Sequence, residues 1–269
     1  MIYVFIALIV IFIILIIHSY IKIDITRFNI KDKKIDKNLK IMLLSDLHNR
    51  DIKDKLEKII SQENPDMIIL SGDMINEFVG DQENFFKLTS ILEKYKTYYT
   101  FGNHEEACIK DLKNDYLKKL NKTKLIILND DKTKLSNNMM LYGLDVDISF
   151  FEGLRKKKLD NKYIEERLGK LNKEKYNIAI AHNPLMAYAY ESFGFDLVFS
   201  GHVHGGLVKL PLLGGILSPE YKLFPKYYEG IYNLNKTKMI VSRGLGFCKR
   251  LPIRILNPAE VVIINLCNK

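Results

Sequence analysis

Cysteine is scarce in this chain, and its arrangement excludes two kinds of stabilised small protein. Three cysteines, Cys108, Cys248 and Cys267, are spread widely over 269 residues. Because their number is odd and none belongs to a Cys-x-x-Cys pair, they indicate neither a disulfide framework nor a cysteine metal site. Internal repeats and low-complexity linkers are absent too. With 47% hydrophobic residues, the chain is instead expected to bury a sizeable core.

A concentrated block of positive charge is also missing. The formal net charge is +9, which favours an anionic neighbour such as a membrane surface, a phosphorylated substrate or a nucleic acid. The lysines are dispersed, however, and the sequence contains no recognisable nucleic-acid-binding module. We therefore expect no nucleic-acid partner and assign much of the excess charge to a solvated surface.

Charge is absent altogether from the first 17 residues, and the apolar character continues to Ile21. This length is close to the roughly 20 residues that span the hydrocarbon layer of a bilayer as a helix. The segment is apolar on all sides, which is not typical of a core helix with one buried face. A cleaved signal peptide is the alternative, but no charged region precedes the apolar run and no small-x-small site follows it. Residues 1–21 are predicted to be a retained single-pass anchor in the cell membrane.

The segment after the predicted anchor, residues 22–37, is rich in basic residues and is interpreted as a basic juxtamembrane linker. By the positive-inside tendency, this flank favours a cytoplasmic position for the domain that follows. The same lysines could bind anionic lipid headgroups. From residue 22 to residue 40, the basic residues are Lys22, Arg27, Lys31, Lys33, Lys34, Lys37 and Lys40, against Asp24, Asp32 and Asp36.

The remainder of the chain alternates short apolar runs, typical of buried strands, with segments of helical apolar spacing. In the first half, strands are expected at 39–44, 67–70 and 97–101, and helices at 51–60, 82–95 and 105–120. In the second half, strands are expected at 125–128, 139–144, 177–181, 196–200, 230–233, 239–242 and 261–266, and helices at 160–171 and 184–190. This rhythm predicts one α/β domain over residues 38–269 with parallel strand pairings.

Five of the six histidines follow the end of an apolar run and stand beside Asp, Asn or Gly. In α/β sheets the ligand crevice lies outside the carboxyl ends of the strands, so these side chains are expected at one edge. Imidazole and carboxylate groups are suitable ligands for zinc, manganese or iron. The motifs are Ser45-Asp46-Leu47-His48, Ser71-Gly72-Asp73, Gly102-Asn103-His104-Glu105, Ala181-His182-Asn183-Pro184 and Gly201-His202-Val203-His204-Gly205-Gly206.

In this order, the five motifs resemble those of the calcineurin-like metallophosphoesterases, over essentially everything after the predicted anchor. The tail from Ser242 through Arg254 and Pro258, together with the anchor, is similar to the bacterial membrane-associated branch. That branch resembles the enzymes that split the pyrophosphate of UDP-2,3-diacylglucosamine. The resemblance implies a four-layer α/β/β/α sandwich of two mixed sheets, preceded here by one N-terminal transmembrane helix.

The resemblance also implies two divalent metal ions, which could be manganese, iron or zinc. It assigns Asp46, His48 and His204 to one ion, Asn103, His182 and His202 to the other, and Asp73 to both. Water shared by two such cations loses its proton near neutral pH, and the hydroxide can attack phosphorus in line. His104 is not a ligand in the family pattern, so it is expected to protonate or orient the leaving oxygen.

Two interpretations stay open for several residues in or near the motifs. Asn103 is assigned to substrate binding besides its metal, and Arg50 either contacts a substrate phosphate or lies in a solvated loop. Glu105 is either a first-turn helix residue, favoured by the helix dipole, or a partner of His104. Arg243 and Arg254 either bind an anionic headgroup or form structural hydrogen bonds.

Residues 207–228 follow the last motif and mix Leu, Ile, Phe and Tyr with proline and glycine. They are interpreted as an irregular flap that covers substrate, rests at the bilayer interface or packs as an ordinary loop. The sequence as a whole predicts a membrane-anchored dinuclear metal phosphohydrolase that cleaves a phosphodiester or pyrophosphate bond. A lipid-linked substrate similar to a UDP-diacylglucosamine is expected. The alternatives are a broad-specificity phosphodiesterase or phosphatase for soluble substrates and a non-catalytic tethered binding protein.

Overall fold

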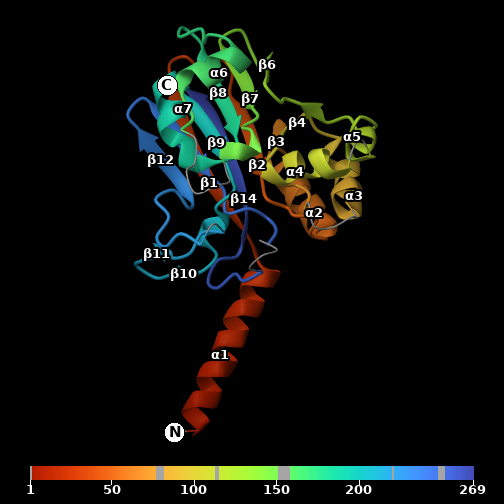
Figure 1. The fold of residues 1–269 in the computed structure, drawn as a ribbon, viewed down its shortest axis with the longest axis vertical. Coiled ribbons are helices and arrows are strands. Elements are labelled where there is room, and N and C mark those ends of the chain that lie inside the picture. Colours follow the sequence, from red (N-terminus) through yellow and green to blue (C-terminus); the bar gives the residue numbers. More distant parts are fainter. Residues whose placement is uncertain (1, 77–81, 113–114, 151–157, 220, 248–251) are drawn as a thin grey trace.

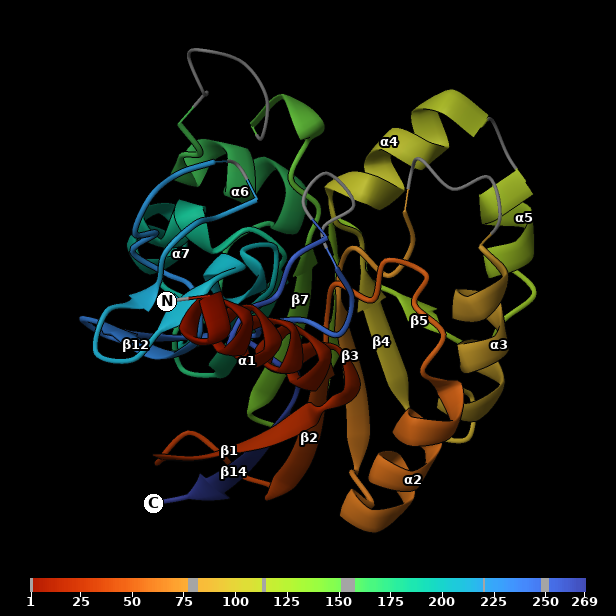
Figure 2. The same ribbon diagram turned by 90° about the horizontal axis from the view of Figure 1, so that it is seen from below.

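Two six-stranded sheets lie face to face between two sets of helices, with one long helix projecting from the body (Figures 1 and 2). The computed structural model describes residues 2–76, 82–112, 115–150, 158–219, 221–247 and 252–269. Both sheets are mixed. The expected four-layer α/β/β/α sandwich is therefore confirmed.

The first sheet has parallel neighbours except at one pairing, where β14 runs antiparallel to β2. Its order is β1 (Ile23–Asp32), β14 (Ala259–Asn268), β2 (Leu39–Leu44), β3 (Met67–Ser71), β4 (Thr97–Thr100) and β5 (Ile126–Ile127). Its outer face is covered by α2 (Lys53–Glu63), α3 (Glu83–Leu92), α4 (Asn103–Leu112) and α5 (Asp115–Leu120) (Figure 2).

The second sheet is parallel in its centre and antiparallel at both edges. Its order is β12 (Gly230–Leu234), β13 (Thr237–Val241), β9 (Leu197–Ser200), β8 (Tyr176–Ala181), β7 (Met139–Leu144) and β6 (Asp131–Lys134). It is covered by α6 (Asn161–Leu168) and α7 (Ala187–Phe193). The remaining elements are the hairpin β10 (Lys209–Leu210) and β11 (Gly214–Gly215) and the 3-10 helices η1 (Ile148–Phe150), η2 (Pro184–Met186) and η3 (His204–Gly206).

Three hydrophobic clusters fill the spaces between the four layers, and β2 shows how one strand serves two of them. Ile41 and Leu43 belong to the cluster between the sheets, whereas Met42 and Leu44 belong to the cluster under the helices. Successive side chains of a strand point to opposite faces, so a strand buried on both faces is a continuous apolar run. This explains why the sequence predicts β2 and β7 with their observed bounds.

Strand β1 lies inside residues 22–37, so the interpretation of that segment as a linker is wrong. β1 pairs in parallel with β14 over ten residues, from Ile23 opposite Ala259 to Asp32 opposite Asn268. As an edge strand it is half-exposed, and Ile30 is its one fully buried residue. The lysine and arginine side chains on its open face gave it the composition of a linker.

The helix predicted over residues 105–120 is also corrected, because the structure contains α4 and α5 in its place. Residues 113–114, between these helices, lie outside the described residues, as does Cys248. Helix α4 begins at Asn103, two residues earlier than expected. The first turn of this helix therefore carries candidate functional side chains.

Helix α1 (Ile2–Ile21) projects from one end of the body, and Ser19 is its one buried residue (Figure 1). Its 20 residues span about 30 Å, the thickness of a bilayer hydrocarbon core. The last turn is docked on the domain. The ring of Tyr20 stacks on Phe247 with 4.1 Å between centroids, and Lys55 Nζ donates to the carbonyl oxygen of Ile21 at 2.9 Å.

Candidate metal centre

The seven predicted metal ligands all lie just beyond the carboxyl ends of five strands. Asp46 and His48 follow β2, Asp73 follows β3, Asn103 follows β4, His182 follows β8, and His202 and His204 follow β9. Strands β2, β3 and β4 are neighbours in one sheet, and β8 and β9 are neighbours in the other. Because the two sheets pack face to face, these ends converge on one place.

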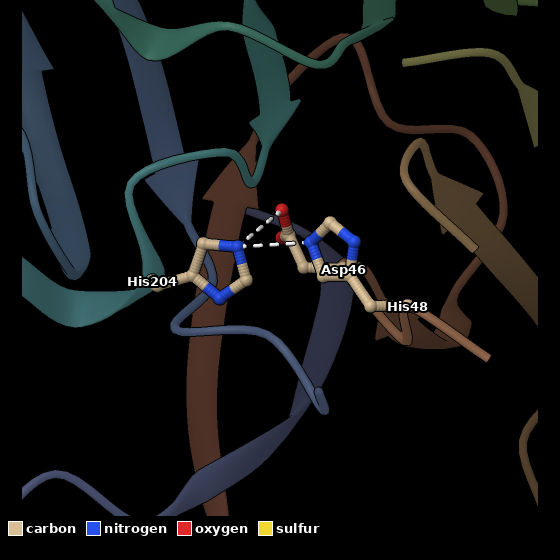
Figure 3. Close-up of side chains that lie close together, drawn as sticks. All are labelled: Asp46, His48 and His204. Carbon is tan, nitrogen blue, oxygen red and sulfur yellow. Dashed lines mark hydrogen bonds and ion pairs between the residues drawn. The ribbon is translucent and has the colours of Figure 1, made fainter. Parts of the chain in front are cut away.

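Three side chains form a first group, in which Asp46, His48 and His204 point toward one another (Figure 3). The Nε2 atoms of His48 and His204 are 3.0 Å apart, and Oδ1 of Asp46 lies 3.6 Å from Nε2 of His204. All three side chains are buried. Two imidazole nitrogens and a carboxylate oxygen converging on one point suit a divalent transition metal or zinc.

A second group contains Asp73, His182 and His202, whose ligand atoms lie within 4.8 Å of one another. Nδ1 of His182 lies 2.7 Å from the carbonyl oxygen of Ser71, so Nδ1 carries the proton and donates it. Its Nε2 atom lies 3.1 Å from Oδ2 of Asp73 and is the ring nitrogen that could bind a cation, which would displace the proton there. The buried Oδ1 atom of Asn103 accepts no hydrogen bond from the described residues, which leaves an amide oxygen for a cation.

The protonation states of the first group also fit a cation. Burial lowers the pKa of His48 to about 3 and lowers the pKa of His204 well below its ordinary value, so both imidazoles are neutral. Burial raises the pKa of Asp46 to about 6. A buried carboxylate without sufficient positive charge takes up a proton, and a bound divalent cation would favour its ionised form.

Asp73 lies between the two groups and has the opposite pKa shift. Burial alone would raise the pKa of its carboxyl, but His182 and His104 hold that pKa well below the ordinary value. The same pairing raises the pKa of His182 to about 10, against the effect of burial. Oδ2 of Asp73 is also 4.0 Å from Nε2 of His48, so this carboxylate borders both groups.

The backbone at these positions is left-handed, which is uncommon for residues other than glycine. Such conformations persist where the surrounding fold holds them, and they concentrate at functional sites. The φ angles are 50° at Asp46, 48° at His48, 53° at Asp73, 71° at His202 and 51° at His204. The tight turns after the strands thus direct these side chains toward a shared centre.

Two glycines allow the loops to approach the carboxylates closely. A Cβ atom on Gly201 would lie 2.3 Å from Oδ2 of Asp46, and one on Gly102 would lie 2.3 Å from Oδ1 of Asp73. This close approach brings backbone N–H groups to the carboxylates. The amide of His202 donates to Asp46 at 2.9 Å. The amide of His104 likewise donates to Asp73 at 2.9 Å.

Glu105 lies in the first turn of α4, as one of its two interpretations has it, and it also has a role that neither interpretation describes. It is fully buried, and its carboxylate accepts hydrogen bonds from backbone amides on two loops, with burial raising its pKa. The donors are Gly102 at 2.8 Å, Asp73 at 2.8 Å, Met74 at 2.7 Å and Ile75 at 3.1 Å. Glu105 therefore ties the Asp73 loop to the start of α4, and this signal is absent from the sequence because the donors converge only in the fold.

Arg254 and Asn257 support the His204 loop from the tail of the chain. Arg254 is fully buried, and its guanidinium donates to the carbonyl oxygens of Gly246 at 2.9 Å and Arg243 at 2.7 Å. Its Nη2 atom is 3.3 Å from Nδ1 of His204, and burial lowers its pKa to about 9. Nδ2 of Asn257 donates to the carbonyl oxygen of His204 at 2.7 Å. These contacts favour structural hydrogen bonding over headgroup binding for Arg254.

His104 lies at the open side of the cluster, and Arg50 lies outside it. Nε2 of the partly buried His104 is 3.9 Å from Oδ2 of Asp73, and its ring meets His48 edge-on at 4.6 Å. Geometry alone also groups His104 with His48 and Asp73 as potential ligands. Arg50 donates to the carbonyl oxygens of Leu245, at 2.6 Å, and Tyr20. Its contact with substrate therefore stays a prediction.

The two-sheet sandwich and the ligand cluster at its edge define a metallophosphoesterase. Residues 39–206 match the calcineurin-like phosphoesterase family, so the chain belongs to that family. Strand β1, the flap and the C-terminal tail lie outside the matched range. In this family, clustered histidines and carboxylates typically hold two metal ions, and the donor set found here fits such a pair.

Among curated proteins, the chain is 31% identical over 256 residues to the uncharacterized metallophosphoesterase Cj0846 of Campylobacter jejuni, covering 91% of this chain and 64% of that protein. It is 28% identical to the uncharacterized metallophosphoesterase YkuE of Bacillus subtilis, with 91% of this chain and 85% of that protein covered. It is 25% identical to the UDP-2,3-diacylglucosamine pyrophosphatase LpxG of Chlamydia muridarum, with 84% of this chain and 83% of that protein covered. The crystal structure of TT1561 of Thermus thermophilus shares the fold, with a TM-score of 0.51, 13% identity, and 77% of this chain and 90% of that chain covered.

Proposed function

We propose that this protein is a membrane-anchored phosphohydrolase that cleaves a phosphodiester or pyrophosphate bond of a lipid-linked substrate with two divalent metal ions. The convergence of the proposed aspartate and histidine ligands, linked to the docked end of α1 through Asn257, carries this proposal. One ion would be held by Asp46, His48 and His204, the other by Asn103, His182 and His202, with Asp73 shared. The ions would supply positive charge to the phosphoryl oxygens and lower the pKa of an attacking water.

His104 is proposed as the group that gives a proton to the leaving oxygen. It stands at the open side of the cluster, where a bound phosphate can be reached, while the proposed ligands lie deeper. Its backbone amide is held by Asp73, which fixes the start of α4 at the site. General-acid catalysis of this kind contributes about 10²- to 10⁴-fold to rate.

The membrane assignment rests on the position of α1 relative to the site. The amide of Asn257 donates to Oγ of Ser19 in the last turn of α1 at 3.3 Å, and the same residue's side chain holds the His204 loop. If α1 spans the bilayer, this short connection keeps the site at headgroup depth, where lipid phosphates lie. The similarity to LpxG supports a nucleotide-linked diacylglucosamine as substrate class, and the basic flank of α1 favours the cytoplasmic face.

The substrate proposal is tested with the full chain in lipid nanodiscs, supplied with manganese. Hydrolysis of UDP-2,3-diacylglucosamine in the bilayer is compared with hydrolysis of soluble bis-p-nitrophenyl phosphate. We expect kcat/KM to be at least about tenfold higher for the lipid, a difference of about 1.4 kcal/mol in barrier. Turnover of the soluble diester with none of the lipid pyrophosphate would instead favour a broad-specificity phosphodiesterase.

The anchor has its own test, because a signal peptide would be removed from the mature chain. The protein is extracted from membranes with detergent after an alkaline wash, and its intact mass is measured. Retention in the washed membrane, with a mass that includes residues 1–21, supports the anchor. A shortened, washable chain contradicts it.

A further inference from the structure

The flap, residues 207–228, presents an unusual amount of apolar surface. Of the ten large hydrophobic residues exposed outside α1 in the described chain, six lie between Leu210 and Phe224. The most exposed is Leu212, which is entirely open to solvent, followed by Leu223, Leu213, Tyr221 and Phe224. Contiguous exposed apolar surface in a folded protein marks an interaction site more often than chance exposure does.

The backbone of the flap holds these side chains outward in conformations that large residues rarely adopt. Leu212, Tyr221 and Phe224 have φ angles of 71°, 59° and 49°. Glycine takes such positions without strain, so bulky apolar residues there need another reason to be present. The flap also contains three lysines and one glutamate, a charge balance that suits an anionic surface.

The position of the flap identifies that surface. Hairpin β10–β11 lies at the end of the body from which α1 projects (Figure 1). The connection is direct, since the hydroxyl of Tyr20 in α1 donates to the carbonyl oxygen of Pro252. Three residues later, the carbonyl oxygen of Ile255 accepts from the amide of Lys209 at the start of the hairpin. The half-exposed Ile253 lies between these contacts.

The flap is also joined to the metal loop. A Cβ atom on Gly206 would lie 2.7 Å from Cα of Gly215, so the hairpin packs closely against the end of the Gly-His-x-His motif. The amide of Leu217 donates to the carbonyl oxygen of Gly206 at 3.2 Å. The tip of the hairpin is therefore separated from His204 by only a few residues of ordered chain.

We infer that the flap is a second membrane contact, with the side chains of Leu212, Leu213, Leu223 and Phe224 inserted among the lipid headgroups and upper acyl chains beside α1. The inference rests on the proposed function only in taking α1 as a membrane anchor. Tyrosine and lysine side chains at the flap favour the same interface, where one end of the side chain is apolar and the other wet. Two contacts, α1 and the flap, hold the domain in one orientation with the metal loop near the headgroups.

The chain contains no tryptophan, so a single introduced tryptophan reports its own surroundings by its fluorescence. Leu212→Trp and, separately, Leu223→Trp are made in the full chain and placed in nanodiscs of phosphatidylethanolamine and phosphatidylglycerol. The matched control is Tyr188→Trp, since Tyr188 is 79% exposed on α7, a helix that lies farther from α1 than the hairpin does (Figure 1). We expect blue-shifted emission and loss of most intensity with brominated acyl chains at the two flap positions, and neither change at the control.

Emission at both flap positions that matches the control, with no quenching by brominated lipid, would overturn the inference. A blue shift that persists in brominated lipid and grows with protein concentration would also overturn it, because a second copy would then cover the flap. Leu212 makes no buried contact, so its substitution is not expected to disturb the fold. The measurement requires no hydrolysis, and failure of the chain to enter nanodiscs would instead contradict the anchor.

Discussion

At the scale of single residues, the candidate site also depends on side chains that are neither proposed metal ligands nor proposed substrate contacts. Glu105 is the clearest case, because one buried carboxylate receives four backbone amides from the loops that carry Asp73 and Asn103. Removing an acceptor from a buried donor costs more than the hydrogen bond itself contributes, because the donor remains desolvated. Glu105 thus holds in place the backbone of the loops whose side chains are the proposed ligands.

Glu105→Gln is expected to lower the free energy of unfolding by about 1 to 3 kcal/mol, because an amide NH2 group faces backbone N–H groups that need an acceptor. It is also expected to weaken metal binding by about 10- to 100-fold through displacement of the Asp73 loop. Chemical denaturation and metal titration measure these effects. The exposed Glu166→Gln is the control, and equal behaviour of the two variants would contradict this role of Glu105.

Asp145 predicts a pH dependence of stability. Burial, with the nearby carboxylates of Glu106 and Asp130, raises its pKa to about 9. The folded state therefore keeps a proton that the unfolded chain releases near pH 4, so this group's contribution to stability falls as pH rises from about 4 to 9.

Asp145→Asn removes that titration, and its neutral side chain can still donate to a carboxylate. Relative to the natural chain, the variant is expected to gain about 1.4 kcal/mol in unfolding free energy per pH unit between pH 5 and pH 9, or about 5 kcal/mol over the range. Denaturation series at several pH values measure the difference. A constant offset between the two chains across this range would show that Asp145 has an ordinary pKa.

The candidate site was predictable from the sequence where each residue carried its own signal. Asp46, His48 and the paired histidines follow apolar strands, the paired histidines stand beside glycine, and the structure brings these side chains together. The contacts of Glu105 and Arg254 were not predictable, because their partners lie far along the chain and converge only after folding. The contacts of Arg50 were not predictable for a related reason, since its guanidinium donates to carbonyl oxygens from α1 and the tail.

At the scale of elements, burial decided which strands the sequence could predict. Interior strands such as β2 and β8 are continuous apolar runs because both of their faces are covered. Edge strands have an exposed face and a polar composition, so β1 was interpreted as a linker and β6 was not anticipated. The split between α4 and α5 has no proline or glycine to mark it.

Strand β1 gives a direct prediction about truncated chains. A chain of residues 22–269 keeps every strand of the first sheet, whereas residues 38–269 lack β1 and expose the edge of β14. Loss of the ten-residue pairing and of buried Ile30 is expected to cost about 3 kcal/mol or more, lowering Tm by roughly 6 to 12 °C. Thermal unfolding of both chains measures this. Equal Tm values would mean that β1 is not part of the folded domain.

At the scale of the whole molecule, three features meet at one end of the body. Helix α1 leaves there, the apolar hairpin lies there, and the tail between them contacts the loop of His204 (Figure 1). The family match ends at residue 206, so the flap and the tail lie outside the matched range. In our proposal, this arrangement holds the candidate metal centre close to a lipid bilayer.

The most direct test of this account measures metal content and turnover together. The full chain is stripped with a chelator, resupplied with manganese, zinc or iron, and assayed on bis-p-nitrophenyl phosphate beside Asp73→Ala and the exposed control Asp54→Ala. We predict two ions per chain, turnover that disappears on stripping and returns with metal, and loss of both the full metal content and turnover in Asp73→Ala alone. Turnover that survives complete stripping, or that folded Asp73→Ala retains, would contradict the dinuclear centre.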